Sequence, residues 1–298
     1  MEQTQNHQHT KNWYDKIYKW IIIIPIVLII FSVIYLVNFN VKNGDLIYKD
    51  VSLTGGTTVT VFDSEVNIES AKLSLKEEFP DLIIREMSDI RTGKQHGFFV
   101  ETTADSDSIK TALEKYLGYK LTSENSSIEF SGSSLSTGFY QQLKIAILIA
   151  FLLMAITVFF IFRTVVPSGA VILSAFADII MTLVVVDILG IRLSTGGIVA
   201  FLMLIGYSVD TDILLTTRLI KNKDGTINQR ILGAFKTGMT MTLTSITAIG
   251  ISFIIIYSFS DTLRQIFGIV LIGLGFDIFN TWITNTSVLK WYMEAKQT

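Results

Sequence analysis

The sequence predicts a polytopic α-helical membrane protein with six transmembrane helices and one α+β ferredoxin-like domain between the first and second helices. Half of the 298 residues are hydrophobic, and only 17% are charged, against roughly 25% in soluble domains. The hydrophobic residues are also gathered into six long runs, and five of these lie in the second half of the chain.

Each apolar run approaches the ~20 residues that cross a bilayer as a helix. The expected spans are residues 20–39, 143–162, 167–189, 196–216, 239–259 and 263–285. The first run is longer than the apolar part of a signal peptide and no small-residue cleavage site follows it, so we expect it to remain as a helix. Pro25 inside this run is expected to kink it.

The basic residues predict the orientation. Most of those near the membrane flank one set of ends, namely Lys11, Lys16, Lys19, Arg163, Arg218, Lys221, Lys223, Arg230, Lys236, Lys290 and Lys296. The opposite short loops carry only Arg192 and Arg264. Cytoplasmic loops are enriched in Lys and Arg, so both termini should be cytoplasmic, in the plasma membrane. The expected division is a cytoplasmic tail 1–19, the first helix 20–39, an extracytoplasmic domain 40–140, five helices in 141–290 and a cytoplasmic tail 291–298.

The expected external domain has its own charge balance and its own pattern. Between Asn38 and Tyr140 there are 16 acidic and 10 basic side chains, although the whole chain has a net charge of only −2. Alternating β-branched runs and two capped helical runs follow one another in the order βαββαβ, which is the ferredoxin-like unit. The strands are expected at 57–62, 82–87, 97–103 and 126–132, and the helices at 67–79 and 107–118.

Several classes of chemistry are absent from the sequence. There is no cysteine, which excludes thiol catalysis, disulfides and cysteine metal sites. No phosphate-binding G-x-x-x-x-G-K-[ST] loop is found. We therefore expect no catalytic residue, no metal, no cofactor and no nucleic-acid partner, and we do not expect an enzyme.

Aspartates within the apolar runs are the candidate functional residues. Asp210 and Asp212 interrupt the fourth run, and Asp178 and Asp277 lie near the middle of the third and sixth. A carboxylate at the centre of a membrane costs ~2.5–3.5 kcal/mol on insertion scales, and such residues usually mark ion or proton pathways. We expect a polar seam among the third to sixth spans, joined by the hydroxyl-rich start of the fifth.

The two aspartates of the fourth span face different directions. Residues two apart on a helix are separated by about 200°, so Asp210 and Asp212 cannot line one groove together. Asp210 shares its face with Gly206, where a close helix contact could form, and is therefore the preferred candidate. Structural roles remain open alternatives for each aspartate, most of all for Asp212, which could pair with a nearby threonine.

Two motifs in this arrangement resemble the archaeal branch of the SecF family. They are "LTGGT", with Thr54, Gly55 and Gly56 after the first span, and "IGYSVDTDILLTTR", with Gly206 and Tyr207 in the fourth. The resemblance covers essentially the whole chain. It implies membership of the resistance–nodulation–division superfamily, and a protein-export accessory subunit that uses the proton or sodium gradient. The implied partners are a SecD-like subunit, the Sec translocon channel, the exported polypeptide and membrane lipids.

One departure from the family pattern concerns the basic partner of the aspartates. Bacterial members carry a basic residue near the start of the fifth span, where this sequence reads "AFKTGMTM" and offers only Lys236. Arg218 is the other candidate, although for Arg218 and its basic neighbours we favour topology anchoring over a role as ion partners.

Two other function classes remain as alternatives. Half of a small-molecule exporter of the same superfamily would share the six spans, but such exporters usually contain two such halves. An intramembrane aspartyl protease would need one aspartate on each of two helices, and Asp210 with Asp277 would serve. In "GLGFD", however, Phe276 separates the aspartate from the glycine that should precede it.

Overall fold

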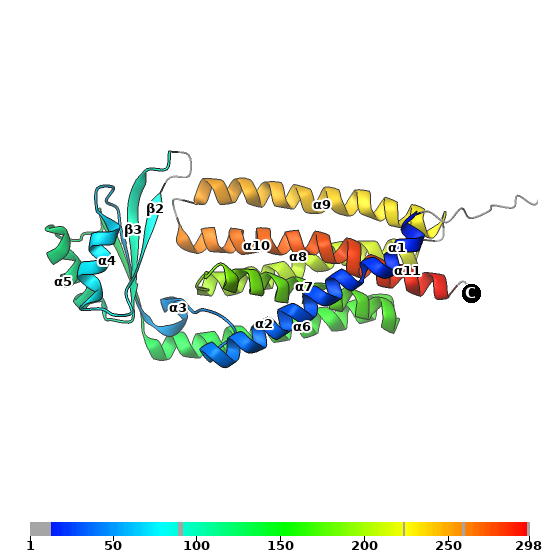
Figure 1. The fold of residues 1–298 in the computed structure, drawn as a ribbon, viewed down its shortest axis with the longest axis horizontal. Helices are drawn as coiled ribbons and strands as arrows, with labels where there is room; N and C mark the ends of the chain where they lie inside the picture. Colours follow the sequence, from blue (N-terminus) through cyan, green and yellow to red (C-terminus); the bar gives the residue numbers. More distant parts are fainter. Residues whose placement is uncertain (1–12, 89–91, 223, 258–259, 297–298) are drawn as a thin grey trace, which may run out of the picture.

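A bundle of long helices carries a small β-sheet at one end (Figure 1). This computed structural model describes residues 13–88, 92–222, 224–257 and 260–296. Within them, six helical segments are long and apolar enough to cross a membrane. These segments are Ile17–Asn43, Ser133–Phe162, Val165–Ile188, Thr195–Ile220, Ile227–Ile256 and Asp261–Ala295. The predicted number of spans is confirmed, and the chain is a multi-pass membrane protein.

Two helices form the centre of the bundle. In the most apolar 18-residue stretch of each helix, 61% is buried inside the chain in α7 (Val165–Ile188) and 56% in α8 (Thr195–Ile220). The corresponding share is 11% in both α6 (Ser133–Phe162) and α9 (Ile227–Ile256). The apolar side chains of these outer helices therefore face outwards, where lipid or another subunit can cover them.

The first span contains an interruption near its start. A single residue, Ile22, separates helix α1 (Trp13–Ile21) from α2 (Ile23–Asn43). Pro25 has no N–H to donate to the carbonyl of Ile21, and its ring crowds that carbonyl. The interruption at Ile22 lies about one turn before Pro25, and the kink itself stays a prediction.

Three helices extend beyond the apolar runs that predicted them. Helix α6 begins at Ser133 rather than at 143, and α9 begins at Ile227 rather than at 239. The added segments are polar, so hydropathy does not detect them. A capping box formed by Thr226 and Gln229 fixes the start of α9. The last span likewise continues to Ala295, beyond the expected end at 285.

The sixth span is one long rod of three consecutive parts. They are α10 (Asp261–Phe279), a π-helical segment η1 (Asn280–Asn285) and α11 (Thr286–Ala295). π-Helical turns inside α-helices are rare and occur frequently at functional sites.

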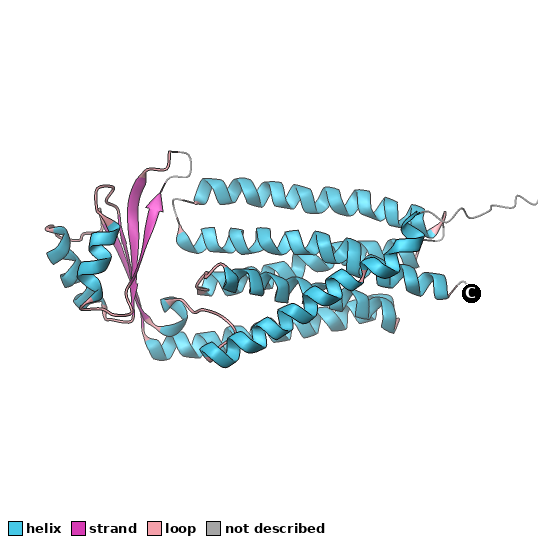
Figure 2. Cartoon of the chain, viewed as in Figure 1, coloured by secondary structure: helices cyan, strands magenta, loops and turns pink. Residues whose placement is uncertain are grey.

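The β-sheet domain (residues 56–131) has the element order that the sequence predicts. It contains β1 (Gly56–Val61), α4 (Ile68–Lys76), β2 (Ile83–Ser88), β3 (Gln95–Thr102), α5 (Ser106–Leu117) and β4 (Ser126–Ser131). The four strands are antiparallel neighbours in the order β2-β3-β1-β4. Helices α4 and α5 cover the face away from the bundle, as Figure 2 shows. Fully buried Val59, Val61, Phe98, Val100 and Leu113 lie in the core between the sheet and these helices.

The predicted helix ends in this domain are also observed. The Asn67 side chain accepts a hydrogen bond from the backbone N–H of Ser70 and caps α4. Gly118 adopts a left-handed conformation (φ 76°) and ends α5.

The glycine pair of "LTGGT" lies where the sheet meets the bundle, between the one-turn helix α3 (Val51–Thr54) and β1. Gly55 has φ +90°, and a Cβ there would lie 2.2 Å from the backbone of Ser133 at the start of α6. A Cβ on Gly56 would lie 2.3 Å from the carbonyl oxygen of Thr102. Both positions require glycine because another segment of backbone lies too close for a side chain. At the end of α3, the hydroxyl of Thr54 donates a hydrogen bond to the backbone carbonyl of Asp50.

Candidate functional site

Three of the four predicted aspartates are buried in the interior of the bundle. Asp178 comes from α7, Asp212 from α8 and Asp277 from α10, and each is 0% exposed. The polar seam predicted among the spans is therefore present, and it lies among α7, α8 and the sixth span.

Asp178 is held by two neighbours from different helices. One carboxylate oxygen accepts a hydrogen bond of 2.5 Å from Ser208 Oγ on α8, and the other accepts one of 2.7 Å from Asn280 Nδ2 on η1. Asn280 in turn accepts a bond from Thr284 one turn further along. These contacts join three helices around a single carboxylate.

Asp212 is bonded on one side only. Its Oδ1 accepts from Thr281 Oγ1 at 2.8 Å and from Asn285 Nδ2 at 2.7 Å, both on η1. Its Oδ2 is buried and makes no hydrogen bond of standard geometry among the described residues, although Ser174 on α7 lies near this carboxylate. Asn285 Oδ1 and Thr216 Oγ1 likewise have no partner of standard geometry among these residues. Unpaired acceptors in a buried position are costly, so this side of Asp212 has unused capacity for a proton or an ion.

Thr281 connects Asp212 to Asp277. Its hydroxyl oxygen lies 2.8 Å from Asp212 Oδ1 and 3.1 Å from Asp277 Oδ1, while Thr211 lies 3.4 Å from the other oxygen of Asp277. A threonine hydroxyl has one hydrogen and can donate to only one of the two carboxylates. The second contact is satisfied only when that carboxyl group itself carries a proton.

Within the described part of the chain, no ion pair reaches these three aspartates. Moving one ion out of water costs several kcal/mol even after relaxation. Three uncompensated charges would therefore cost about as much as the ~5–15 kcal/mol by which a folded protein is usually stable. The cluster must be neutralised by protons or by a monovalent cation. The described residues contain no group of three or more His, Cys, Asp and Glu side chains that could hold a metal ion.

Asp210 does not belong to this cluster. It is exposed on the opposite face of α8, as the separation of about 200° predicts. Gly206 and Tyr207 share that exposure, and no atom lies within 4 Å of a Cβ placed on Gly206. The close helix contact that favoured Asp210 over Asp212 is therefore not made inside this chain. An aspartate pair formed by Asp210 and Asp277, as a protease would need, is not formed either.

The two predicted basic partners lie apart from the buried carboxylates. Arg218, near the end of α8, donates to Thr237 Oγ1 on α9 at 3.2 Å. Lys236 is exposed on α9. The hydroxyls of α9 also differ from expectation. Thr240, Thr244 and Thr247 are exposed and donate to carbonyls four residues earlier in their own helix.

Asn285 is the site residue that sequence reasoning missed. It stood at the end of the predicted sixth span, and ordinary α-helical spacing did not place it beside Asp212. The π-helical segment changes that spacing and directs Asn280, Thr281, Thr284 and Asn285 inwards, all of them at most 1% exposed. The repeated Asn and Thr residues of "NTWITNT" are the one signal that could have indicated it.

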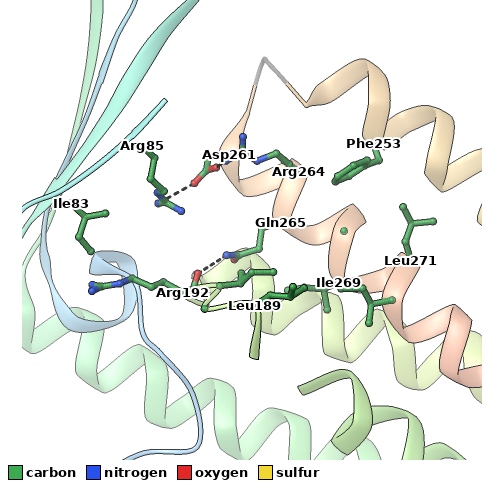
Figure 3. Close-up of a pocket in the computed structure, with 14 residues that line it drawn as sticks. Ile83, Arg85, Leu189, Arg192, Phe253, Asp261, Arg264, Gln265, Ile269 and Leu271 are labelled. Atoms are coloured by element: carbon green, nitrogen blue, oxygen red, sulfur yellow. Dashed lines mark hydrogen bonds and ion pairs between the residues drawn. The ribbon is translucent and has the colours of Figure 1, made fainter. Parts of the chain in front are cut away.

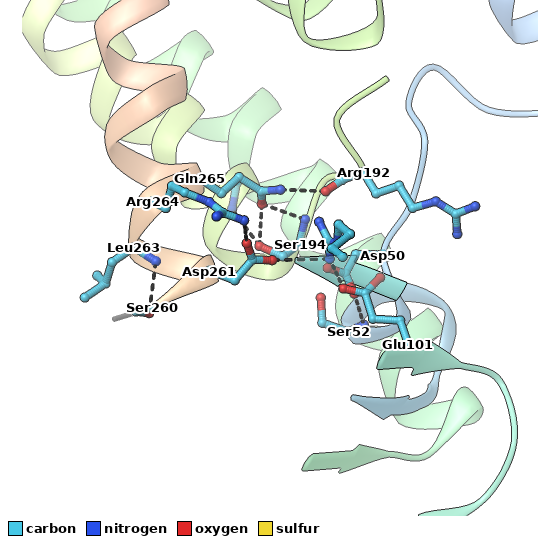
Figure 4. Close-up of polar contacts among 12 residues, drawn as sticks. Asp50, Ser52, Glu101, Arg192, Ser194, Ser260, Asp261, Leu263, Arg264 and Gln265 are labelled. Carbon is cyan, nitrogen blue, oxygen red and sulfur yellow. Dashed lines mark hydrogen bonds and ion pairs between the residues drawn. The ribbon is translucent and has the colours of Figure 1, made fainter. Parts of the chain in front are cut away.

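A second polar cluster joins the bundle to the sheet (Figure 4). Gln265 Oε1 on α10 accepts from the backbone N–H and the hydroxyl of Ser194, and its Nε2 donates to the carbonyl of Arg192. Ser194 caps the start of α8. The side chain of Asp50 caps α3 close by, and burial raises its pKa although the N–H of Ser52 and the charge of Arg85 oppose the shift.

A cavity of about 600 Å³ lies beside this cluster (Figure 3). Ile83 and Arg85 of β2 line its side towards the sheet, and Leu189 after α7, Phe253 on α9 and Ile269 on α10 are among the residues that line the rest.

Three relatives match this chain over nearly the whole length of both proteins. SecF from Methanocaldococcus jannaschii is 39% identical over 93% of this chain and 96% of its own length. SecF from Methanothermobacter thermautotrophicus is 38% identical over 94% of each chain, and SecF from Methanolacinia petrolearia is 37% identical over 93% of this chain and 94% of its own. The profile described as "Protein export membrane protein SecD/SecF, C-terminal" also matches residues 110–295.

This chain belongs to the SecF family.

Solved structures related to the SecF family show the same fold. The crystal structure of SecDF, a translocon-associated membrane protein from Thermus thermophilus, matches with a TM-score of 0.74 over 93% of this chain. SecDF in its super-membrane-facing form matches with a TM-score of 0.60 over 95%. Both are 18% identical, so the likeness concerns the fold alone. This SecF-family chain spans 38% of the first SecDF chain and 39% of the second.

Proposed function

We propose that this chain is a membrane subunit of the protein-export machinery that pairs with a SecD-like subunit and uses the proton or sodium gradient to assist translocation. The observation that carries the proposal is the cluster of Asp178, Asp212 and Asp277, which is fully buried and lacks a cationic partner among the described residues. Such a cluster must gain or lose a proton or cation whenever its surroundings change, and this couples helix movement to the ion gradient.

Asp212 is the residue on which the coupling depends most. It has the unpaired oxygen and shares Thr281 with Asp277, so its charge state alters contacts from α8 to the sixth span. One charge that crosses a potential of 100 mV yields ~2.3 kcal/mol, enough to shift a two-state equilibrium substantially. Arg218 and Lys236 are the cations that could approach if α8 and α9 moved relative to each other.

The exposed face of α8 is the proposed contact for the SecD-like subunit. Gly206, Tyr207 and Asp210 are exposed there in the middle of a span, where a lone carboxylate facing lipid would be costly. The small share of the SecDF chains that this chain covers supports a second half of similar architecture. Further proposed partners are the Sec translocon channel, the exported polypeptide and, on the outer helices, membrane lipids.

The sheet domain is proposed to be an extracytoplasmic ferredoxin-like domain, with both termini in the cytoplasm. The excess of basic residues on the opposite side of the bundle supports this orientation. The proposed domain limits remain a tail to 19, a first helix 20–39, the external domain 40–140, helices in 141–290 and a tail from 291.

The coupling is tested by Asp212→Asn, which keeps size and polarity but cannot ionise. Inverted vesicles that contain the chain, its partner and the translocon would be assayed for export with and without an imposed gradient. We expect the variant to insert and co-purify normally and to lose the gradient-dependent stimulation. Wild-type stimulation in Asp212→Asn would show that the carboxylate is structural.

Asp210→Asn is the matched comparison on the same helix. Because Asp210 faces away from the cluster, any loss in this variant should follow a loss of the co-purified partner. If Asp210→Asn keeps its partner but loses all stimulation, the coupling carboxylate is Asp210, and the assignment to Asp212 is wrong.

The orientation is tested by single cysteines, for which a chain without cysteine is a clean background. An impermeant thiol reagent applied to intact cells should label Ser106→Cys in the sheet domain and leave Lys223→Cys unlabelled. The reverse pattern would place the sheet domain in the cytoplasm.

A further inference from the structure

Four charged side chains form a chain of alternating sign between the sheet and the bundle. Glu101 on β3 pairs with Arg85 on β2, Arg85 pairs with Asp261 at the start of α10, and Asp261 pairs with Arg264 one turn later. The middle pair is the one that crosses from the sheet domain to the bundle. It joins Arg85 Nη2 to Asp261 Oδ2 at 3.2 Å, as Figure 3 shows.

The middle pair can open without leaving an unpaired charge. If the sheet moves away, Arg85 keeps Glu101, which is 3% exposed, and Asp261 keeps Arg264. The Arg85–Glu101 pair and the Asp261–Arg264 pair are then each neutral. Breaking a buried pair is expensive mainly because one charge is left alone, and that cost does not arise here.

The segment that leads from the first span into β1 is attached to the bundle more firmly. The backbone of Leu193, between α7 and α8, exchanges hydrogen bonds with Tyr48 and Asp50, and the N–H of Thr195 donates to Ser52 Oγ. Gly55 packs directly on the backbone of Ser133 at the start of α6. These contacts are backbone contacts or close steric contacts, so the segment before β1 acts as a hinge.

Empty volume lies beside the ion pair. The cavity of about 600 Å³ is bounded by Ile83 and Arg85 on the sheet and by α10 on the bundle. Protein interiors are otherwise close-packed, so the side chains beside this space are held less tightly than those of a packed core.

Helix α10 connects this ion pair to the buried carboxylates. Gln265 fixes the start of α10 to the cap of α8, and the close packing of Gly273 against Leu204 leaves no space for a Cβ. Further along, Thr281 joins Asp212 to Asp277. The pair of helices that holds these two carboxylates is therefore the body to which Arg85 attaches the sheet.

We propose that Arg85 is a positioning residue that transmits the state of the α8–α10 pair to the sheet domain through a releasable ion pair with Asp261. The sheet domain then has a closed position, with the pair formed, and a tilted position, with the pair open about the Gly55 hinge. In terms of the function proposed above, the charge state of Asp212 would choose between the two positions.

The proposal is tested by distance measurements on the full chain in nanodiscs. Spin labels are attached at Lys115→Cys in α5 and Leu263→Cys in α10, both exposed positions. Arg85→Gln should shift the distance distribution to longer values. Arg192→Gln is the matched control, because Arg192 lines the same cavity but contributes its backbone carbonyl to the junction, and it should leave the distribution unchanged.

Coupling is then read from a double-mutant comparison. Asp212→Asn should shift the distribution when Arg85 is present and have no effect in the Arg85→Gln background. If Arg85 had only a structural role, Arg85→Gln would lower thermal stability but would leave the response to Asp212→Asn in place. An unchanged distribution in Arg85→Gln, or an equal response to Asp212→Asn in both backgrounds, would overturn the proposal.

A second design does not depend on the folding of Arg85→Gln. The pair Arg85→Cys/Asp261→Cys lacks the ion pair, so its gradient-dependent export is compared before and after cross-linking. A short thiol-specific linker should lower this export further, and cleavage of the linker should restore the level measured before cross-linking. The pair Ser52→Cys/Thr195→Cys locks a contact on the hinge and should not alter export. Equal effects of both locks, or no effect of the first, would contradict a releasable pair. The spin-label distances need no export assay, so a failed export function would leave the distance test intact.

Discussion

The sheet domain and the centre of the bundle are stabilised in opposite ways. Behind the sheet lies an apolar core, in which Val59, Phe98 and Leu113 are fully buried. The centre of the bundle buries carboxylates, amides and hydroxyls instead, around Asp178 and Asp212. In the first region burial is favourable for each residue by itself, whereas in the second it is tolerable only when partners and charge state are right. The first region is suited to a fixed scaffold and the second to a switch.

The largest expected effect concerns the scaffold. Phe98→Ala removes a fully buried ring from the sheet core and should lower the stability of the sheet domain by ~3–5 kcal/mol. Hydrogen exchange of the full chain in nanodiscs would show faster exchange in the sheet domain, while the helices keep their protection. If hydrogen exchange became equally faster in the sheet domain and in the helices, the two regions would not be independent, and the comparison would be wrong.

Gly55→Ala should have the next largest effect. Its φ of +90° disfavours any side chain, and a Cβ would collide with the backbone of Ser133. Backbone strain alone costs about 1–3 kcal/mol, and the collision adds to it. Gly132→Ala is the control, because Gly132 has an ordinary φ of −65° and nothing lies within 4 Å of its Cβ position. In thermal unfolding monitored by circular dichroism, Gly55→Ala should have a lower melting temperature than Gly132→Ala. Equal melting temperatures would contradict the close contact.

Thr281→Val tests the switch. It keeps the shape of the side chain but removes the hydroxyl shared by Asp212 and Asp277, at a cost of ~1–3 kcal/mol for the acceptors left unpaired. We expect Thr281→Val to lose most of the gradient-dependent export, whereas its melting temperature should fall only slightly. Thr240→Val removes an exposed hydroxyl that bonds only its own helix, and it should change neither quantity. Full export activity in Thr281→Val would show that the shared hydroxyl has no functional role.

The smallest effect concerns pH and the scaffold. Burial alone would raise the pKa of Asp81, but hydrogen bonds from Thr103 and Thr102 outweigh it and lower that pKa. The resulting stabilisation is present above the unfolded value of about 3.9 and is lost as pH falls through the folded value. Asp81→Asn should therefore melt at a lower temperature than wild type at pH 7, and the difference should shrink on acidification below about pH 4. A constant difference across that range would exclude ionisation as the cause.

The two regions also differ in how far the sequence predicts them. Asn67, Gly118 and the alternating strands are local signals, and the order of the elements followed from them because each element buries its own apolar face. In the bundle, the burial of Asp178, Asp212 and Asp277 and the opposite direction of Asp210 followed from depth and helical spacing. The preference for Asp210 stays a prediction, and its premise of a close helix contact at Gly206 is not met among the described residues, because a glycine on a helix does not reveal whether its neighbour is in this chain or in another.

The bonding of Asn285 and the ion pair of Arg85 with Asp261 could not be predicted for other reasons. The first depends on a π-helical turn, which has no clear sequence signature. The second joins residues far apart in sequence, one in a strand and one at a helix start. Both depend on tertiary packing, which a local pattern does not contain.

The length of the last span has a mechanical consequence. Thirty-five residues from Asp261 to Ala295 form an almost continuous rod. At ~1.5 Å per residue it measures roughly 50 Å, well beyond the ~30 Å of the hydrocarbon layer. Each end therefore stands in or near water, while Asp277 and Thr281 lie close to the midpoint. Gln265 ties the start of this rod to the cap of α8, so a displacement around the carboxylates reaches Asp261, where the sheet is attached, as a movement of the starts of both helices together.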